Sequence, residues 1–135
     1  LAGYIPSNNR SQLENTEHNK LIVDAYNANP TSMAAAIQNF RDMQVSPKMA
    51  ILGDMRELGD SSEEEHQKVA DMLKDAGFDT VWLVGEEFGK TRCDFRKFAN
   101  ANEVKEELSK NRPEGQYILI KGSNGMKLYQ LPELL

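Results

Sequence analysis

Polar or glycine-bearing loops directly follow the apolar runs of the chain, at residues 24–30, 53–59, 85–89 and 121–125. The first of these loops begins with Asp24 and the last begins with Lys121. In an open α/β sheet, ligands bind beyond the carboxyl ends of the strands. Right-handed crossovers place such loops along one edge of the sheet. The residue types therefore predict a ligand-binding edge to which all four loops contribute.

The same loops contain no complete set of catalytic residues. Residues 85–91 (GEEFGKT) are similar to a phosphate-binding P-loop, but one residue is missing between the glycines, and two glutamates would repel phosphate. The chain has no dinucleotide-binding, zinc-protease or serine-hydrolase motif. Cys93 is the single cysteine, and His18 lies far from His66 in the sequence. We therefore expect no metal site within the chain.

Each loop also has a purely structural interpretation. Residues 24–30 can be a strand-to-helix turn, Gly53 and Gly59 can be turn residues, and Lys121 can be a solvated lysine at a strand end. His66 lies near the apolar stripe of a helix, so a half-buried packing role suits it better than catalysis.

The apolar runs predict buried strands, because they are apolar throughout rather than alternating with polar residues. They lie at residues 21–23, 49–52, 81–84 and 117–120. Longer stretches with helical spacing separate them, which is typical of parallel strands joined by helices. Residues 11–15 are expected to pair with 20–24 as a hairpin. We predict an α/β fold: a Rossmann-like, mostly parallel sheet with helices on both faces and one antiparallel edge hairpin.

Capping residues mark three helices between these strands. Asn29 can cap the first helix, with a proline at the first helical position. Ser62 and Glu65 have the spacing of a capping box, and Gly77 can close the second helix in the left-handed conformation. The third helix is expected over residues 103–110.

Size and charge limit the kinds of partner. The chain has 135 residues and a formal net charge of −5. This length suits a single domain, residues 1–135, with a core that needs no disulfide. Lysine and arginine form no stripe interleaved with aromatic residues, so we expect no nucleic-acid partner. No apolar run approaches the ~20 residues that span a bilayer. We expect a cytosolic fragment without a membrane partner.

Three motifs, in order, resemble the C-terminal domain of the Mur ligases. They are residues 24–33 (DAYNANPTSM), 52–59 (LGDMRELG) and 120–126 (IKGSNGM). Residues 6–12 are similar to the Pro-x-x-x-Arg segment that opens this domain, so the resemblance extends along nearly the whole chain. It is closest to the branch that adds D-alanyl-D-alanine to the peptidoglycan precursor.

This resemblance implies an ATP-dependent amide ligation in the bacterial cytoplasm. ATP phosphorylates the terminal carboxylate of a UDP-N-acetylmuramoyl-tripeptide, and the amine of D-Ala-D-Ala attacks the acyl phosphate. The resemblance also implies an N-terminal domain for the UDP sugar and a central P-loop domain that binds Mg²⁺, both outside this chain. The present domain would close over ATP and help to place the acceptor, and would be inactive alone.

The resemblance also assigns residues to the nucleotide and to the acceptor. Arg10 would contact the ribose or phosphates, and Asp24 would accept hydrogen bonds from the ribose hydroxyls. The nucleotide wall would be completed by Tyr26, Asn27 and Asn29.

On the acceptor side, the resemblance implies that Lys121 and Ser123 act as catalytic residues facing the reacting carboxylate and the acceptor. Gly122 would permit close approach, and Glu57 would contact the acceptor amine. Many relatives carry arginine where this chain has Asn124, so no cationic contact is expected from that position. Many also carry histidine at the position of Ala28, so no general base is expected there.

Besides a stand-alone binding module with no enzymatic parent, two other functions compete with this interpretation. One is a different ligase of the same superfamily, such as a folylpolyglutamate synthase, which shares the architecture. The other is a flavodoxin-like phospho-accepting signalling domain, because Asp24, Asp54 and Lys121 all lie at strand ends. Against it, Ala25 follows Asp24 where a second acidic residue is expected, and no hydroxyl residue directly follows Val84.

Overall fold

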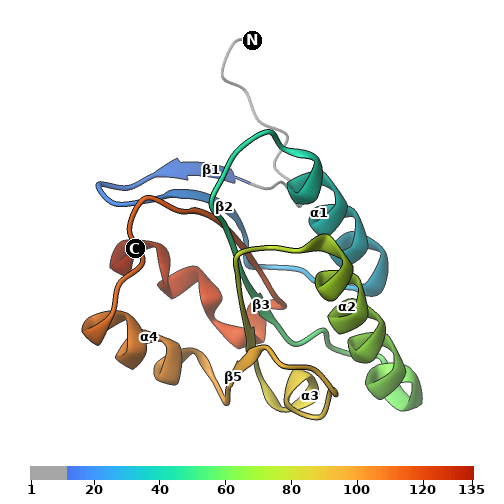
Figure 1. Cartoon of the computed structure of the whole chain (residues 1–135). Helices are drawn as coiled ribbons and strands as arrows, with labels where there is room; N and C mark the ends of the chain where they lie inside the picture. The colour runs from blue at the N-terminus through green and yellow to red at the C-terminus, as the bar shows by residue number, and fades with distance from the viewer. Residues whose placement is uncertain (1–11) are drawn as a thin grey trace, which may run out of the picture.

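The computed structural model describes residues 12–135, which form a six-stranded sheet between two layers of helices and turns (Figure 1). The strand order is β1-β2-β6-β3-β4-β5. β1 is antiparallel to β2, and every other pair of neighbours is parallel. This confirms the predicted mostly parallel sheet with an antiparallel edge hairpin. The strands are β1 Gln12–Asn15, β2 Lys20–Asp24, β3 Lys48–Gly53, β4 Thr80–Val84, β5 Arg96–Phe98 and β6 Tyr117–Lys121.

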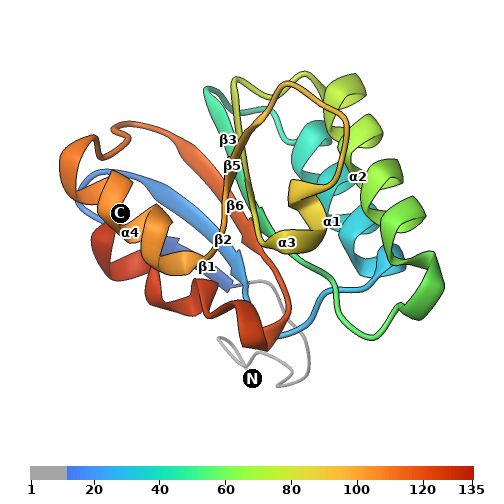
Figure 2. The ribbon, with the colours of Figure 1, turned by 90° about the horizontal axis from the view of Figure 1, so that it is seen from below.

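Helices cover both faces of the sheet, as predicted (Figure 2). One face packs against α1 and α2, and the other packs against α4 and the 3-10 turns that follow β6. The short helix α3 follows β4 directly. The bounds are α1 Pro30–Asp42, α2 Ser62–Ala76, α3 Glu86–Gly89 and α4 Ala101–Lys110, with turns at Gly59–Ser61, Asn124–Met126, Leu128–Gln130 and Pro132–Leu134.

The central strands are buried on both faces because their side chains alternate between two apolar clusters. In β3, Met49 and Ile51 belong to the cluster under α4, whereas Ala50 and Leu52 belong to the cluster under α1 and α2. All four are at most 2% exposed. This two-sided burial explains why the strand sequences are apolar throughout. No helix among residues 12–135 is long and apolar enough to cross a membrane.

Two of the helix caps predicted from the sequence are present in the structure, and a third is not. Asn29 caps α1: the backbone N–H of Ser32 donates to Asn29 Oδ1 at 2.8 Å. Gly77 closes α2 with a φ of 70°. The capping box predicted for Ser62 and Glu65 is wrong, because Ser62 is already helical (φ −56°, ψ −49°). A 3-10 turn leads directly into α2, so the side chain of Ser62 does not cap the helix and can form hydrogen bonds elsewhere.

The sequence interpretation missed two short elements, β5 and α3. β5 has only three residues, two of them charged and exposed, so it lacks the apolar pattern of the other strands. α3 occupies the segment that was expected to be an open loop. Together with the start of α4, these elements extend the carboxyl edge of the sheet beyond β4.

Candidate functional site

The carboxyl ends of the five parallel strands meet at one edge of the sheet, as the sequence predicts. Residues 25–29 follow β2 and residues 122–123 follow β6 in the middle of this edge. Residues 54–58 follow β3, Gly85 follows β4, and residues 99–100 follow β5. The candidate site residues therefore divide into a group around β2 and β6 and a second group around β3, β4 and α4.

Asp24 and Lys121 form a buried ion pair across β2 and β6. They are direct partners in the parallel register, and Lys121 Nζ donates to Asp24 Oδ2 at 2.6 Å. The ammonium also donates to the backbone carbonyl of Asn27 at 3.0 Å. The Lys121 side chain is only 2% exposed and that of Asp24 10%. The pair therefore joins the two strand ends and holds the start of the loop after β2.

The other residues predicted to contact the nucleotide lie in different environments. The side chain of Asn29 is engaged in the cap of α1. Tyr26 is 61% exposed, and its ring stacks on that of Tyr129, with 5.7 Å between centroids and 4° between planes. Asn27 is exposed beside it. Tyr26 and Asn27 are thus open to a ligand. Arg10 lies outside the described residues.

The predicted acceptor residues after β6 are tightly packed against β3. Ser123 is 8% exposed, and its hydroxyl donates to the backbone carbonyl of Asp54 at 2.9 Å. A Cβ at Gly122 would lie 3.2 Å from Gly53 Cα, so the two strand ends touch where both residues lack a side chain. Glu57 is exposed and has a φ of 63°. The assigned contacts of these residues with the acceptor stay predictions.

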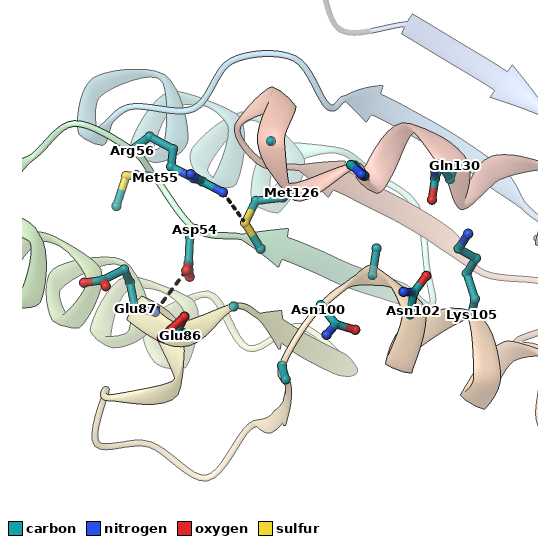
Figure 3. A pocket seen from close by; sticks show the side chains of 15 residues that line it. Asp54, Met55, Arg56, Glu86, Glu87, Asn100, Asn102, Lys105, Met126 and Gln130 are labelled. Atoms are coloured by element: carbon teal, nitrogen blue, oxygen red, sulfur yellow. Dashed lines mark hydrogen bonds between the residues drawn. The ribbon is translucent and has the colours of Figure 1, made fainter.

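A pocket of about 530 Å³ lies at the same edge, beyond β3 and β4 (Figure 3). Its wall is formed by residues 54–56, 85–87 and 99–102, by Lys105, and by residues 125–127 with Gln130. Among residues 12–135, none that the sequence assigned to the nucleotide or the acceptor lines it. Arg56 belongs to one of the three quoted motifs and was overlooked there. Residues 100–105 gave no signal, because only the fold brings α4 to this edge.

The carboxylate of Asp54 forms the floor of this pocket. It accepts hydrogen bonds from the backbone N–H groups of Glu87 and Phe88, both at 2.9 Å, and so holds the first turn of α3 (Figure 3). Burial raises the pKa of Asp54 and outweighs the opposing effect of these two bonds. Gly85 is required beside it, because a Cβ there would lie 2.3 Å from the carboxylate.

Behind the floor, His66 holds the loop that follows β3. It is 0% exposed, which corrects the expected half-buried position but confirms the structural role. The backbone N–H of Met55 donates to His66 Nε2 at 3.0 Å, so Nδ1 carries the proton and donates to the backbone carbonyl of Ser62 at 2.7 Å. The Ser62 hydroxyl donates to Glu87 Oε1 at 2.7 Å and thereby lowers the pKa of Glu87.

Comparisons with known proteins show which family this chain belongs to. The model of the family described as "Mur ligase, glutamate ligase domain" matches residues 9–124. The chain belongs to the Mur ligase family. This membership excludes the phospho-accepting signalling domain as an alternative. The carboxylate of Asp54, moreover, already accepts two backbone hydrogen bonds.

Several ligases are similar to this Mur ligase chain along most of its length. The UDP-N-acetylmuramoyl-tripeptide--D-alanyl-D-alanine ligase of Rickettsia prowazekii is 31% identical over 134 residues, which are 95% of this chain and 30% of the relative. The enzyme of the same name from Bacillus subtilis is 33% identical over 97% of this chain and 31% of the relative. The chain thus spans about 30% of the length of these relatives.

Solved structures show the same fold. MurF from Acinetobacter baumannii is 28% identical, with a TM-score of 0.80 over 96% of this chain and 30% of that protein. MurF ligase from Thermotoga maritima, in complex with ADP, has a TM-score of 0.80 at 21% identity, covering 99% of this chain and 32% of that protein. At that identity the second match shows the fold alone.

Proposed function

We propose that residues 1–135 are the C-terminal domain of a longer bacterial, cytoplasmic ligase that adds D-Ala-D-Ala to UDP-N-acetylmuramoyl-tripeptide in peptidoglycan synthesis. One observation carries this proposal: the family match over residues 9–124 coincides with relatives that bear this name and cover 95% or more of the chain. The same relatives favour this branch over a folylpolyglutamate-type ligase. The remaining length of such relatives would supply the domains for the UDP sugar and for ATP hydrolysis.

In this proposal ATP activates the tripeptide carboxylate as an acyl phosphate, and the amine of D-Ala-D-Ala displaces the phosphate to form the amide. The present domain contributes binding and orientation. Holding two reactants in the reacting geometry removes part of the entropic barrier of a bimolecular step. The carboxyl edge suits this task, since ligands of open α/β sheets bind there.

Asp24 is the proposed contact for the ribose of ATP. Lys121 occupies Asp24 Oδ2, whereas Asp24 Oδ1 accepts no hydrogen bond from residues 12–135. A carboxylate held by a lysine on one oxygen can accept a ribose hydroxyl on the other. A flat surface nearby is formed by the exposed rings of Tyr26, in the loop after β2, and Tyr129, in a turn after β6. Arg10, Asn27 and Asn29 complete the proposed wall.

Lys121, Gly122 and Ser123 are proposed to serve the acceptor by shaping this edge. Their polar groups already bond to Asp24, Asn27 and Asp54, which supports a role in fixing the loops after β2 and β3. Glu57 remains the proposed partner of the acceptor amine, because it is exposed in the loop that follows β3.

Mg²⁺ has no fitting site in residues 12–135. No group of three or more His, Cys, Asp or Glu side chains in this range is arranged to hold a metal ion. Oxygen ligands are what Mg²⁺ requires, usually together with the phosphates of the nucleotide. We therefore assign its ligands to the proposed central domain.

The test uses the whole ligase with ATP, UDP-N-acetylmuramoyl-tripeptide and D-Ala-D-Ala, and measures the amide product. Asp24→Asn retains an oxygen for Lys121 but loses the charge. We expect it to raise the KM for ATP about 10-fold or more, the value of one charged hydrogen bond, with the KM for D-Ala-D-Ala nearly unchanged. Asp42→Asn, at the exposed end of α1, is the control.

Absence of product with these three substrates would refute the proposed function. An unchanged KM for ATP in Asp24→Asn would refute only the role of Asp24. Melting curves of both variants separate a lost contact from a loosened fold.

A further inference from the structure

His66 completes a closed ring of hydrogen bonds behind the loop that follows β3. On one side its Nε2 accepts from the backbone N–H of Met55 at 3.0 Å. On the other side its Nδ1–H donates to the backbone carbonyl of Ser62 at 2.7 Å, and the Ser62 hydroxyl donates to Glu87 Oε1 at 2.7 Å. The backbone N–H of Glu87 donates in turn to Asp54 Oδ2 at 2.9 Å, which leads back to the residue before Met55 (Figure 3). The ring therefore fixes α2, α3 and the loop to one another.

The imidazole can complete this ring in only one protonation state. Nε2 accepts a backbone N–H and so carries no proton, which leaves the proton of the neutral ring on Nδ1. An imidazolium donates from both nitrogens and could not accept from Met55. The side chain of His66 is 0% exposed, and its ring packs edge-on against Phe88, with 4.7 Å between centroids. Packing therefore keeps the acceptor nitrogen directed at the loop.

The loop held by this ring contains a backbone conformation that needs support. Glu57 has a φ of 63°, in the left-handed region that favours glycine. A non-glycine residue stays in such a region when the surrounding structure fixes it. Within residues 12–135, the bond from Met55 to His66 is the last backbone hydrogen bond before Glu57 along the chain. This bond therefore limits where the exposed carboxylate of Glu57 can lie.

We propose that His66 is a positioning residue of the ligation: its neutral imidazole holds the loop after β3 so that the Glu57 carboxylate contacts the acceptor amine. This inference rests on the proposed function, in which Glu57 receives that amine. His66 itself is buried behind the loop and acts through Met55. Such a residue affects the rate because the reaction depends on the orientation of its two reactants.

The first test measures the hydrogen bond in the isotope-labelled 135-residue chain. Proton–nitrogen correlation spectra of the imidazole should show a protonated Nδ1 and an unprotonated Nε2. His66→Gln offers an amide oxygen to the Met55 N–H, whereas His66→Phe keeps a ring beside Phe88 and offers no acceptor. The Met55 amide should exchange its hydrogen about 10-fold faster or more in His66→Phe than in His66→Gln. A proton on Nε2 in the folded chain would overturn the inference.

The second test measures the kinetics of the whole ligase. His66→Phe should lower kcat/KM for D-Ala-D-Ala about 10-fold or more and leave the KM for ATP within about twofold. His66→Gln should restore most of the lost activity. Val69→Ala is the matched control, because Val69 is buried one turn further along α2 and its side chain forms no hydrogen bonds. It reduces packing under the same helix and should leave both constants within about twofold.

A double variant shows whether His66 acts through Glu57. Glu57→Gln alone should also lower kcat/KM for the dipeptide. Adding His66→Phe to it should then cost about threefold or less, because two residues that act through one contact are not additive. The inference is overturned if the two effects multiply, or if His66→Phe and Val69→Ala slow the reaction equally.

Failure of the proposed function has a different signature. Wild-type ligase that forms no product from the three substrates refutes that function, and the positioning role of His66 is refuted with it. The spectra of the 135-residue chain would still show whether His66 binds the Met55 N–H. Active ligase in which His66→Phe keeps its full kcat/KM overturns the inference alone.

Discussion

Gly85 occupies a position where the floor of the pocket leaves no room for a side chain. Its φ of 119° lies in a region that favours glycine, and an added Cβ would lie 2.3 Å from the carboxylate of Asp54. That carboxylate holds the first N–H groups of α3. A side chain at position 85 would therefore disturb the backbone of the pocket as well as the residue itself.

Gly85→Ala should lower the free energy of unfolding by about 2–3 kcal/mol, because it combines backbone strain with the displacement of Asp54. Urea unfolding of the 135-residue chain measures this change. Gly89→Ala, at the other end of the short helix that Gly85 precedes, is the matched control: a Cβ there meets nothing within 4 Å. It should be neutral or stabilising by up to about 1 kcal/mol. Equal effects of the two substitutions would contradict the assignment.

Individual residues were predictable where their role is local. Asn29 as a helix cap and Gly77 as a helix end follow from backbone geometry that their neighbours in sequence define. Ser62 and Glu65 failed as a capping box because a preceding 3-10 turn had already placed Ser62 inside the helix. The hydroxyl of Ser62 instead bonds Glu87, 25 positions away, which no local pattern can indicate.

At the level of elements, the strands that form the centre of the sheet were predictable and its periphery was not. Runs such as residues 117–120 are apolar throughout because the strand is covered on both faces. β5 is short, carries Arg96 and Lys97, and forms only through pairing with β4. Because β5 and α4 were not placed at the edge of the sheet, the pocket beside them was not predicted either.

The link between β2 and β6 depends on the ion pair of Asp24 with Lys121. Lys121→Met would leave the carboxylate of Asp24 largely buried without its partner. Breaking one side of a buried pair costs about 3–5 kcal/mol, and we expect a loss of that order in the free energy of unfolding. Chemical denaturation of the 135-residue chain gives this value directly.

The double variant Asp24→Asn with Lys121→Met distinguishes the pair from simple loss of packing. It should be more stable than Lys121→Met alone, since no charge is then left unpaired. Kinetics of the whole ligase, measured on the same variants, show whether Lys121 also affects the reaction. A loss below about 1 kcal/mol in Lys121→Met would mean that the pair contributes little to the fold.

At the scale of the whole molecule, the described residues form apolar clusters on both faces of the sheet. The 135-residue chain is therefore expected to fold alone, since a chain near this length buries roughly 68–70% of its unfolded surface. It should neither hydrolyse ATP nor bind it tightly, because phosphoryl transfer requires a phosphate cradle and Mg²⁺ ligands. The few exposed groups around Asp24 suggest an affinity for ATP no better than about millimolar.

Calorimetric titration with Mg-ATP and a phosphate-release assay on the same sample measure both properties. A cooperative thermal transition confirms independent folding. Micromolar binding, or phosphate release above the blank, would show that the chain holds a complete nucleotide site.

The position of β6 between β2 and β3 affects how the chain folds during its synthesis on the ribosome. Asp24 and Lys121 are neighbours in the sheet but 97 positions apart in the chain. At roughly 5–20 residues per second, the ribosome needs roughly 5–20 seconds to pass from one to the other. Until β6 is made, β2 has an unpaired edge, and so has β3 once it has been made; such edges invite aggregation and chaperone binding. A slow stretch of translation before residue 117 would prolong that exposure, so codon choice there should affect the yield of folded protein.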